Sequence, residues 1–167
     1  EAEGVDPSIR VDYSPGRDIP AVPMDVEKLK QVVINIVRNG IEAMMEEGGV
    51  LSITSRLVKW GGGERLVSQR LRSPRNPEVR TKRGHITSGA WVELHIEDSG
   101  SGIDPDDVGK LFIPFFTTKA QGTGLGLPIC ERIMREHGGE IEIESVPSQG
   151  TRFVLRLPGE ALVGETL

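Results

Sequence analysis

A run of closely spaced glycines that leads directly into a helical pattern is the feature that most constrains this chain. Gly122-Thr-Gly-Leu-Gly-Leu127 contains three glycines in five residues, and a helical pattern follows over 128–137. Because glycine has no Cβ, backbone at such a turn can approach a ligand closely and adopt positive φ. The first N–H groups of the helix and the positive end of its dipole face the same turn. The segment therefore predicts a phosphate-binding loop at a helix start.

A second glycine turn, Asp98-Ser-Gly-Ser-Gly102, precedes the first by about twenty residues. Its acidic residue would accept a hydrogen bond from an amino group at the other end of a nucleotide, so the two turns together favour ATP. Neither turn is specific alone, since Gly-x-Gly sequences are common in linkers and tight turns. The run at 122–127 also lacks the Gly-Lys-Ser/Thr of a P-loop and does not follow a buried strand, as a Rossmann turn does.

The composition is that of one globular domain. A length of 167 residues with 37% hydrophobic residues supports a full core, and no stretch approaches the ~20 apolar residues of a membrane span. The net charge of −5 argues against nucleic acid as the main partner. A single cysteine, Cys130, cannot form an internal disulfide and fits a reducing cytoplasm. Since the chain begins at Glu1 without a methionine, we expect it to be a piece of a longer protein.

Hydrophobic patterning predicts both strands and helices. We expect strands over 9–13, 50–58, 90–97, 140–146 and 151–157, and helices over 25–47, 105–112 and 128–137. Asp25 is the expected N-cap of the first helix, and Gly48-Gly49 are expected to end it. The last two strands form a hairpin around 147–150. These elements predict an α/β (α+β) two-layer sandwich, with a mixed, mainly antiparallel sheet and helices on one face.

The first helix has an unusual polar face. Its predicted core stripe consists of Val26, Leu29, Val33, Ile36, Val37, Gly40 and Met44, and its polar face of Gln31, Asn35, Asn39, Glu42 and Glu46. Two asparagines and a glycine inside a helix cost roughly 2 kcal/mol relative to alanine. A merely solvated face is the alternative, but residues that weaken a helix without a structural return indicate a functional site. Asn35 and Asn39, one turn apart, carry oxygens for a hard cation and NH₂ groups for phosphate.

Five motifs in this order resemble those of the GHKL ATP-binding fold. They are the N box at 35–43, the G1 box at 98–102, the F box at 111–119, the G2 box at 122–126 and a final glycine box at 150–153. Their order and spacing are similar to the catalytic ATP-binding domain of bacterial two-component sensor histidine kinases, most of all the nitrogen-regulatory type. The resemblance covers nearly the whole chain except 59–89.

The resemblance implies a role for each matching residue. Asp98 would accept a hydrogen bond from the adenine amino group, Asn39 would ligate Mg²⁺, and Lys119 would meet the γ-phosphate, with a solvated lysine as the alternative. Segment 104–123 would be a lid over the nucleotide, anchored by Phe112, Phe115 and Phe116, and His137 would cap its helix. The implied catalytic residues are Asn35, Asn39 and Lys119, and the implied nucleotide-binding residues are Asn35, Asn39, Asp98, Gly100, Gly102, Ile103, Phe112, Thr118, Lys119, Gly122, Thr123, Gly124, Leu125, Gly126, Leu127 and Thr151.

Asn35 bears on the type of reaction. In the hydrolytic relatives the corresponding residue is a glutamate that activates water, and an amide cannot take that proton. We therefore expect transfer to a histidine on a separate dimerisation domain, because neither His85 nor His95 lies in a helical acceptor context. The implied partners are ATP or ADP, that dimerisation domain in a homodimeric parent, and a response-regulator receiver domain. We expect a monomeric, cytoplasmic fragment of a parent with or without a membrane anchor. The rivals are another GHKL ATPase or serine kinase, and a degenerate nucleotide-sensing module.

Segment 59–89 is a basic insertion. It carries eight Lys or Arg residues and two Glu residues, within a chain of net charge −5. A solvated loop is one interpretation, since long loops without regular structure are often mobile or functional. The other is a docking surface for an acidic partner, in which Arg70, Arg72 and Arg75 would make the contact.

Overall fold

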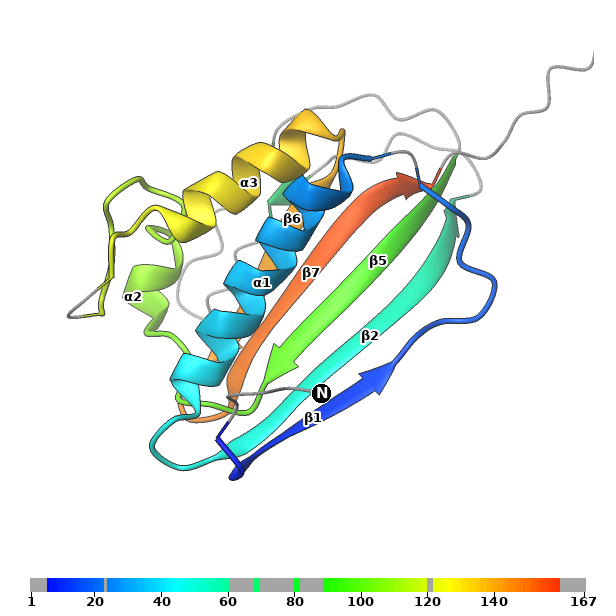
Figure 1. Ribbon diagram of the computed structural model, residues 1–167. Coiled ribbons are helices and arrows are strands. Elements are labelled where there is room, and N and C mark those ends of the chain that lie inside the picture. The colour runs from blue at the N-terminus through cyan, green and yellow to red at the C-terminus, as the bar shows by residue number, and fades with distance from the viewer. Residues whose placement is uncertain are drawn as a thin grey trace, which may run out of the picture.

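The structure is a computed structural model that describes residues 6–22, 24–60, 68–69, 80–81, 89–119 and 122–159. One five-stranded sheet forms a layer, and helices α1 and α3 cover one face of it (Figure 1). The strands run in the order β1 (Ile9–Ser14), β2 (Gly49–Trp60), β5 (Gly89–Asp98), β7 (Gly150–Gly159) and β6 (Glu140–Val146). β1 pairs with β2 in parallel and every other pair is antiparallel. The predicted two-layer sandwich with a mixed, mainly antiparallel sheet is confirmed.

The helices begin and end where local chemistry dictates. Asp25 caps α1 (Val26–Ala43) as predicted, because its carboxylate accepts from the N–H groups of Glu27 and Lys28. The helix ends at Ala43 rather than near Glu47, because residues 44–47 tighten into a turn that Gly48, with φ +72°, completes. α2 (Pro105–Val108) stops before Gly109 and is shorter than expected, whereas α3 (Gly126–Glu136) begins two residues earlier. In the described part of the chain, no helix has the length and apolar character needed to cross a membrane.

A small second sheet lies within the basic insertion. β3 (Ser68–Gln69) pairs with β4 (Arg80–Thr81) in antiparallel fashion, a pairing that the sequence did not predict. The pair is only two residues long, which is too short for apolar alternation to reveal it in the sequence. The proposed docking residues Arg70, Arg72 and Arg75, and also His85, lie outside the described residues.

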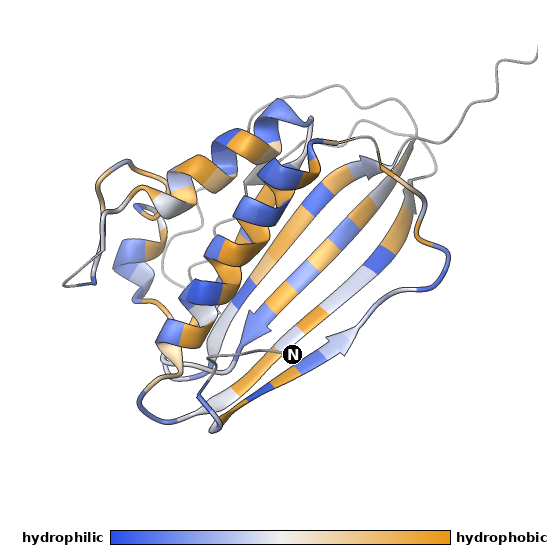
Figure 2. Ribbon diagram, viewed as in Figure 1, coloured by the Kyte–Doolittle hydropathy of each residue, from blue (hydrophilic) through white to orange (hydrophobic). Residues whose placement is uncertain are grey.

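The core fills the space between the helices and the sheet. Strand residues alternate between this core and the opposite face, as the banding of Figure 2 shows. Ile36 of α1, Met134 of α3 and Leu155 of β7 are almost completely buried. Cys130 of α3 is also fully buried, which raises the pKa of its thiol to about 11 and makes it a packing residue.

The predicted stripe of α1 is partly corrected. Val26 is 57% exposed, whereas Val32, which the helical wheel did not place in the stripe, is completely buried. The reason is that α3 packs along this side of α1, with the Cys130 Sγ 3.9 Å from the carbonyl oxygen of Val32. Apolar periodicity alone could not indicate on which side the second helix would lie.

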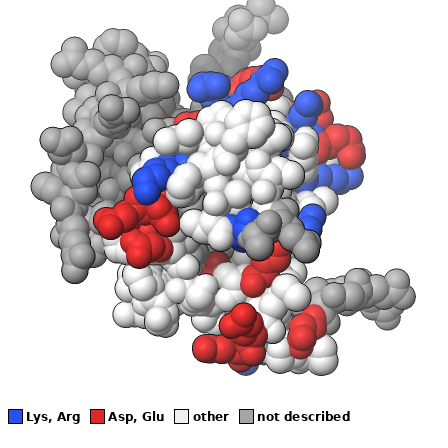
Figure 3. Space-filling model, turned by 90° about the vertical axis from the view of Figure 1, so that its left-hand side faces the viewer, with Lys and Arg blue, Asp and Glu red and all other residues white. Residues whose placement is uncertain are grey.

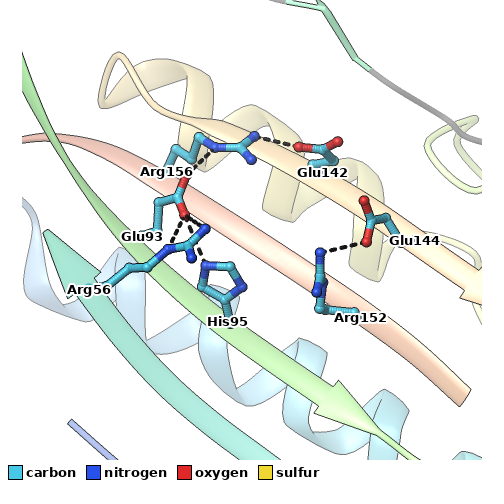
Figure 4. A network of polar contacts seen from close by, with 7 residues as sticks. All are labelled: Arg56, Glu93, His95, Glu142, Glu144, Arg152 and Arg156. Atoms are coloured by element: carbon cyan, nitrogen blue, oxygen red, sulfur yellow. Dashed lines mark hydrogen bonds and ion pairs between the residues drawn. The ribbon is translucent and has the colours of Figure 1, made fainter. Parts of the chain in front are cut away.

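The opposite face of the sheet carries a buried ionic network (Figure 4). Glu93 of β5 is 3% exposed and accepts from Arg156 at 2.7 Å, from Arg56 at 2.8 Å and contacts His95 at 2.9 Å. Arg156 also bonds Glu142 at 2.6 Å. Burial alone would raise the pKa of Glu93, but the three donors outweigh it and lower the pKa to about 2. The network gives His95 a structural position within the sheet.

Candidate nucleotide-binding site

Asp98 ends β5 as a buried carboxylate. It is 5% exposed, and its Oδ1 accepts from the N–H of Gly100 at 3.0 Å and from that of Thr151 at 3.3 Å. None of the hydrogen bonds among the described residues uses its second oxygen, Oδ2. Burial raises the pKa of Asp98, and the two N–H donors partly oppose that shift. The spare oxygen can accept from an amino group of a ligand.

The turn after Asp98 fits tightly between α1 and the β6–β7 hairpin. A Cβ at Gly100 would lie 2.6 Å from the carbonyl oxygen of Ala43, and Gly102 has φ +67°. The N–H of Ile103 donates to Ser145 Oγ at 2.9 Å, and that hydroxyl lies 2.9 Å from Thr151 Oγ1. Ser145 was not predicted as a site residue. Its signal in the sequence is weak, since only the pairing of β6 with β7 places it opposite Thr151.

Two side chains of α1, Asn39 and Glu42, bind the ammonium of Lys119, which comes from the lid. Lys119 Nζ lies 2.9 Å from Asn39 Oδ1 and 2.5 Å from Glu42 Oε2. The other oxygen of Glu42 accepts from Arg38 Nε at 2.8 Å. The hydrogen bond from Lys119, helped by Arg38, lowers the pKa of Glu42. The ammonium of Lys119 is thus bonded by one amide oxygen and one carboxylate oxygen. The sequence placed Glu42 only on the polar face of the helix and gave it no role in the site.

Asn35 lies at the start of α3 instead of on an open face. Its Nδ2 donates to the carbonyl oxygen of Gly126 at 3.1 Å and contacts Cys130 Sγ at 3.6 Å. A Cβ at Gly126 would lie 3.0 Å from Asn35 Oδ1, so any larger residue there would require the Asn35 side chain to shift. Asn35 therefore joins the middle of α1 to the first turn of α3.

The first turn of α3 presents backbone donors. Its N-cap residue, Leu125, makes no side-chain capping hydrogen bond, so none of the first N–H groups is covered by a side chain in this way. Gly124 has φ +65°, and its carbonyl oxygen accepts from the N–H of Phe115 at 2.9 Å. The predicted glycine loop is thus tied to the base of the lid and leads into an uncapped helix start, where an anion can bind.

The lid is described over 104–119 and 122–123. Phe112 packs against the core as expected, and Phe116 is half-buried with Lys110 Nζ 5.4 Å from its ring centre. Phe115, by contrast, is 76% exposed with φ +68°, so its prediction as an anchor is wrong. Figure 3 shows the side of the molecule that carries α2, with a broad uncharged area in its centre and charged residues around it.

The predicted residues thus fall into three groups. Asp98, Gly100, Gly102, Ile103 and Thr151 are joined by the turn after β5, and Asn39 and Lys119 are joined by their hydrogen bond. Asn35 with Gly126, and Gly122 and Gly124 with the lid, form the third group. Gly40 links the first two groups, because a Cβ there would lie 3.2 Å from that of Asp98. Thr118 and Thr123 are exposed, while Leu125 and Leu127 are half-buried.

The residues fit a nucleotide and its metal. Asp98 offers a buried acceptor, the start of α3 offers donors for phosphate, and Asn39 Oδ1 already bonds a positive charge. In the described part of the chain, no cluster of three His, Cys, Asp or Glu residues could hold a metal ion. A metal at Asn39 would therefore depend on amide and phosphate oxygens, as Mg²⁺ bound to nucleotides commonly does.

Comparisons with known proteins agree with this geometry. The family model described as "Histidine kinase-, DNA gyrase B-, and HSP90-like ATPase" matches residues 24–161. The sensor histidine kinase ZraS of Escherichia coli O157:H7 is 33% identical over 150 residues, which are 90% of this chain and 26% of that protein. Sporulation kinase C of Bacillus subtilis is 35% identical over 134 residues, covering 80% of this chain and 24% of that kinase. The chain thus spans about a quarter of the length of these relatives.

Solved structures show the same likeness. The catalytic domain of the histidine kinase ThkA superposes with a TM-score of 0.61 at 32% identity, over 91% of this chain and 80% of that domain. Full-length ShkA in complex with AMPPNP shares the fold, with a TM-score of 0.63 at 22% identity over 90% of this chain and 25% of that one. None of these names points to the nitrogen-regulatory type, which stays a prediction. The chain belongs to the histidine kinase-, DNA gyrase B- and HSP90-like ATPase family, and within it to the catalytic ATP-binding domains of sensor histidine kinases.

Proposed function

We propose that this domain binds Mg²⁺·ATP and transfers the γ-phosphoryl group to a histidine on a separate dimerisation domain of its parent protein. The observation that carries the proposal is the state of Asp98. It is a buried carboxylate held at Oδ1 by two backbone N–H groups, with Oδ2 left for a ligand. Such an acceptor recognises the exocyclic amino group of adenine. Guanine would direct a carbonyl oxygen at the carboxylate, and the two acceptors would repel each other.

The phosphates would lie between α1, the lid and the start of α3. The N–H groups of the first turn of α3 would donate to phosphate oxygens, and Lys119 would bond the γ-phosphate. Asn39 Oδ1 would hold the metal ion. When bound, Mg²⁺ neutralises phosphate charge and orients the phosphate chain. Gly122, Gly124 and Gly126 would allow the backbone to follow the phosphates closely.

The reaction requires an acceptor from outside the chain. A nitrogen of a neutral imidazole attacks the γ-phosphorus, a P–N bond forms, the bond to the bridging oxygen breaks, and ADP leaves with that oxygen. The imidazole loses its N–H proton to the surroundings. Asn35 supports transfer over hydrolysis, because its amide cannot act as a base for water and its Nδ2 is engaged by α3. The phosphohistidine would then supply a response-regulator receiver domain, and we place this chemistry in the cytoplasm, where ATP is available.

A calorimetric titration tests the nucleotide site. Mg²⁺·ATP and then Mg²⁺·GTP are titrated into the wild type, Asp98→Asn and the control Asp12→Asn. Asp12 lies on β1 with its side chain 47% exposed and paired with Arg10, so its substitution removes the same charge outside the proposed site. We expect saturable binding of ATP but not of GTP, lost in Asp98→Asn and kept in Asp12→Asn. Equal binding of the two nucleotides would contradict the role of Asp98.

Phosphoryl transfer separates the proposal from its rivals. The domain is mixed with radiolabelled Mg²⁺·ATP and a dimerisation domain that carries the acceptor histidine, supplied as a separate chain. We expect acid-labile phosphate on that domain and negligible steady ATP turnover without it. Steady turnover by the domain alone would favour an ATPase, and ATP binding without transfer would favour a nucleotide-sensing module.

A further inference from the structure

Among the described residues, the side chain of Lys119 connects the lid to α1 by hydrogen bonds. Lys119 Nζ lies 2.5 Å from Glu42 Oε2 and 2.9 Å from Asn39 Oδ1. Within the described part of the chain, these are the only hydrogen bonds that join residues 104–119 to α1. The ammonium of Lys119 therefore fixes the position of this end of the lid against the helix.

Both partners of this contact are held in place. Glu42 Oε1 accepts from Arg38 Nε at 2.8 Å, one helical turn earlier, which leaves Oε2 directed at the lid. The backbone N–H of Lys119 donates to Thr117 Oγ1 at 3.1 Å, and its carbonyl oxygen accepts from the N–H of Gly122 at 3.1 Å. The two residues of the ion pair are thus each held by further hydrogen bonds, at the carboxylate of Glu42 and at the backbone of Lys119.

The proposed function requires the same ammonium to bind elsewhere. A metal ion at Asn39 Oδ1 would lie beside the ammonium of Lys119, which bonds that oxygen now, and the two cations would repel each other. A terminal phosphate would also draw Lys119 away from Glu42, because it carries more negative charge than one carboxylate. Nucleotide binding therefore exchanges a carboxylate of the protein for a phosphate oxygen as the partner of Lys119.

We infer that Glu42 competes with the γ-phosphate for Lys119 and so sets how strongly this site prefers ATP over ADP. The inference rests on the proposed function. ATP carries the group that takes Lys119 from Glu42, and its binding opposes the ion pair. ADP lacks that group, so Lys119 stays with Glu42 when metal-free ADP binds. Once the γ-phosphoryl group has been transferred, Lys119 returns to Glu42 and the nucleotide-free arrangement is restored beside the departing ADP.

The size of the effect follows from the exposure of the pair. The side chain of Lys119 is 44% exposed and that of Glu42 is 29% exposed. Partly exposed ion pairs are weak, so removing the competitor is expected to tighten ATP binding by about 2- to 5-fold. Glu42 is a positioning residue here, because it acts through Lys119 and does not contact the nucleotide.

The test is a double-mutant cycle with two nucleotides. ATP and ADP are titrated by calorimetry, in the presence of EDTA, into the wild type, Glu42→Gln, Lys119→Met and the double variant. We expect Glu42→Gln to tighten ATP by about 2- to 5-fold and to leave ADP unchanged. Lys119→Met should weaken ATP and abolish the effect of Glu42→Gln. Glu46→Gln removes the same charge from an exposed residue four positions further on, and it should leave both nucleotides unaffected.

A second readout does not depend on nucleotide. Trypsin needs a free lysine side chain, so Glu42→Gln should speed cleavage after Lys119 in the nucleotide-free protein, whereas Glu46→Gln should not. Unchanged cleavage together with unchanged ATP affinity would overturn the inference.

Other outcomes overturn the inference in distinguishable ways. Tightening of ADP as well as ATP, or tightening that persists with Lys119→Met, would mean simple repulsion between Glu42 and phosphate. Weaker binding of Mg²⁺·ATP by Glu42→Gln, with metal-free ATP unaffected, would make Glu42 a metal ligand instead. A wild type that binds no ATP would overturn the proposed function itself, and ATP binding that ignores Glu42 would overturn only the present inference.

Discussion

His137 connects the end of α3 to the start of α1 through Asp25. Its Nε2 accepts from the backbone N–H of Asp25 at 3.1 Å, and its Nδ1 donates to the carbonyl oxygen of Ile133 at 2.8 Å. The ring thus bonds an acceptor at the C-terminus of α3 and the N–H of the N-cap residue of α1. Its predicted role as a capping residue is confirmed, since it is the C-cap of α3.

Replacement of His137 should therefore destabilise the helix pair. We expect His137→Ala to lower the free energy of unfolding by about 1–2 kcal/mol, because two hydrogen bonds of a half-buried ring are lost. Urea denaturation followed by circular dichroism measures this change. Arg135→Ala, at an exposed neighbouring position, should alter the free energy by less than about 0.5 kcal/mol. Equal changes in the free energy of unfolding in the two variants would show that the hydrogen bonds of His137 do not stabilise the helix pair.

Glu93 should be the most costly carboxylate to neutralise. Glu93→Gln removes one of the two carboxylates that pair with Arg156, whose side chain is 12% exposed, and we expect a loss of about 3 kcal/mol. Glu144→Gln is the matched control, because Glu144 and Arg152 are 39% and 40% exposed and such a pair contributes less than about 1 kcal/mol. Similar losses in both variants would contradict the network in Figure 4.

The same network determines how the stability of the protein changes as the pH falls. The pKa of Glu93 is lowered to about 2 in the folded state from a usual 4.5, so the unfolded chain binds the proton more tightly. Its contribution to stability is therefore complete above pH 4.5 and is lost as the pH falls towards 2. Denaturation curves across this range should be steeper in the wild type than in Glu93→Gln. Parallel curves would show that Glu93 is not ionised in the folded protein.

Asp98 should make ATP binding sensitive to acid. Burial raises its pKa, and the protonated carboxyl can no longer accept through a charged Oδ2. ATP affinity should fall at a pH above the ordinary range of an aspartate, while protonation of the same group favours the folded state. Calorimetry at decreasing pH, on the wild type and Asp98→Asn, isolates the part that depends on Asp98. A difference that persists unchanged down to the ordinary pKa of 3.8 would contradict the effect of burial.

Two glycines of the lid region should respond in opposite ways to alanine. Gly124 has φ +65°, and a Cβ there would lie 2.4 Å from the carbonyl carbon of Phe115. Gly124→Ala should cost about 1–2 kcal/mol and disturb the backbone that leads into α3, with at least a ~10-fold loss of ATP affinity. Gly109 has φ −69° and nothing within 4 Å of a Cβ, so Gly109→Ala should stabilise by about 0.5 kcal/mol. Thermal unfolding and ATP titration of both variants measure the contrast.

Local patterns predict the elements of this fold, but not every pairing between them. The alternation of 140–146 and 151–157 and the turn between them are enough to predict an antiparallel hairpin. The parallel pairing of β1 with β2 is not predictable in this way, because the alternation of a strand is the same whichever direction its neighbour runs. The start of α1 is better determined than its end, since Asp25 carries its own capping chemistry whereas Ala43 ends α1 only because of the turn that follows. The start of α3 has no such cap, and it lies two residues earlier than predicted.

Some residues of the site can likewise be predicted from local patterns, and others cannot. Asp98 and the glycine turns stand out because their residue types are unusual where they occur. Lys119 does not, and the sequence offers solvent or phosphate as its partner, whereas the structure adds Glu42, 77 residues earlier. Asn35 likewise meets Gly126, 91 residues later. Such contacts depend on how the lid and α3 return to α1, which no local pattern encodes.

The bond between Asp98 and Thr151 also bears on how the protein is made. The two residues are 53 positions apart, and the N–H of Thr151 belongs to the last strand of the sheet. A ribosome completes Asp98 long before it completes β7, and until then the carboxylate lacks one of its two backbone donors and the neighbouring strand that encloses it. In a growing chain the site that we propose for adenine is therefore incomplete, and we expect nucleotide to bind only after the β6–β7 hairpin has emerged and folded.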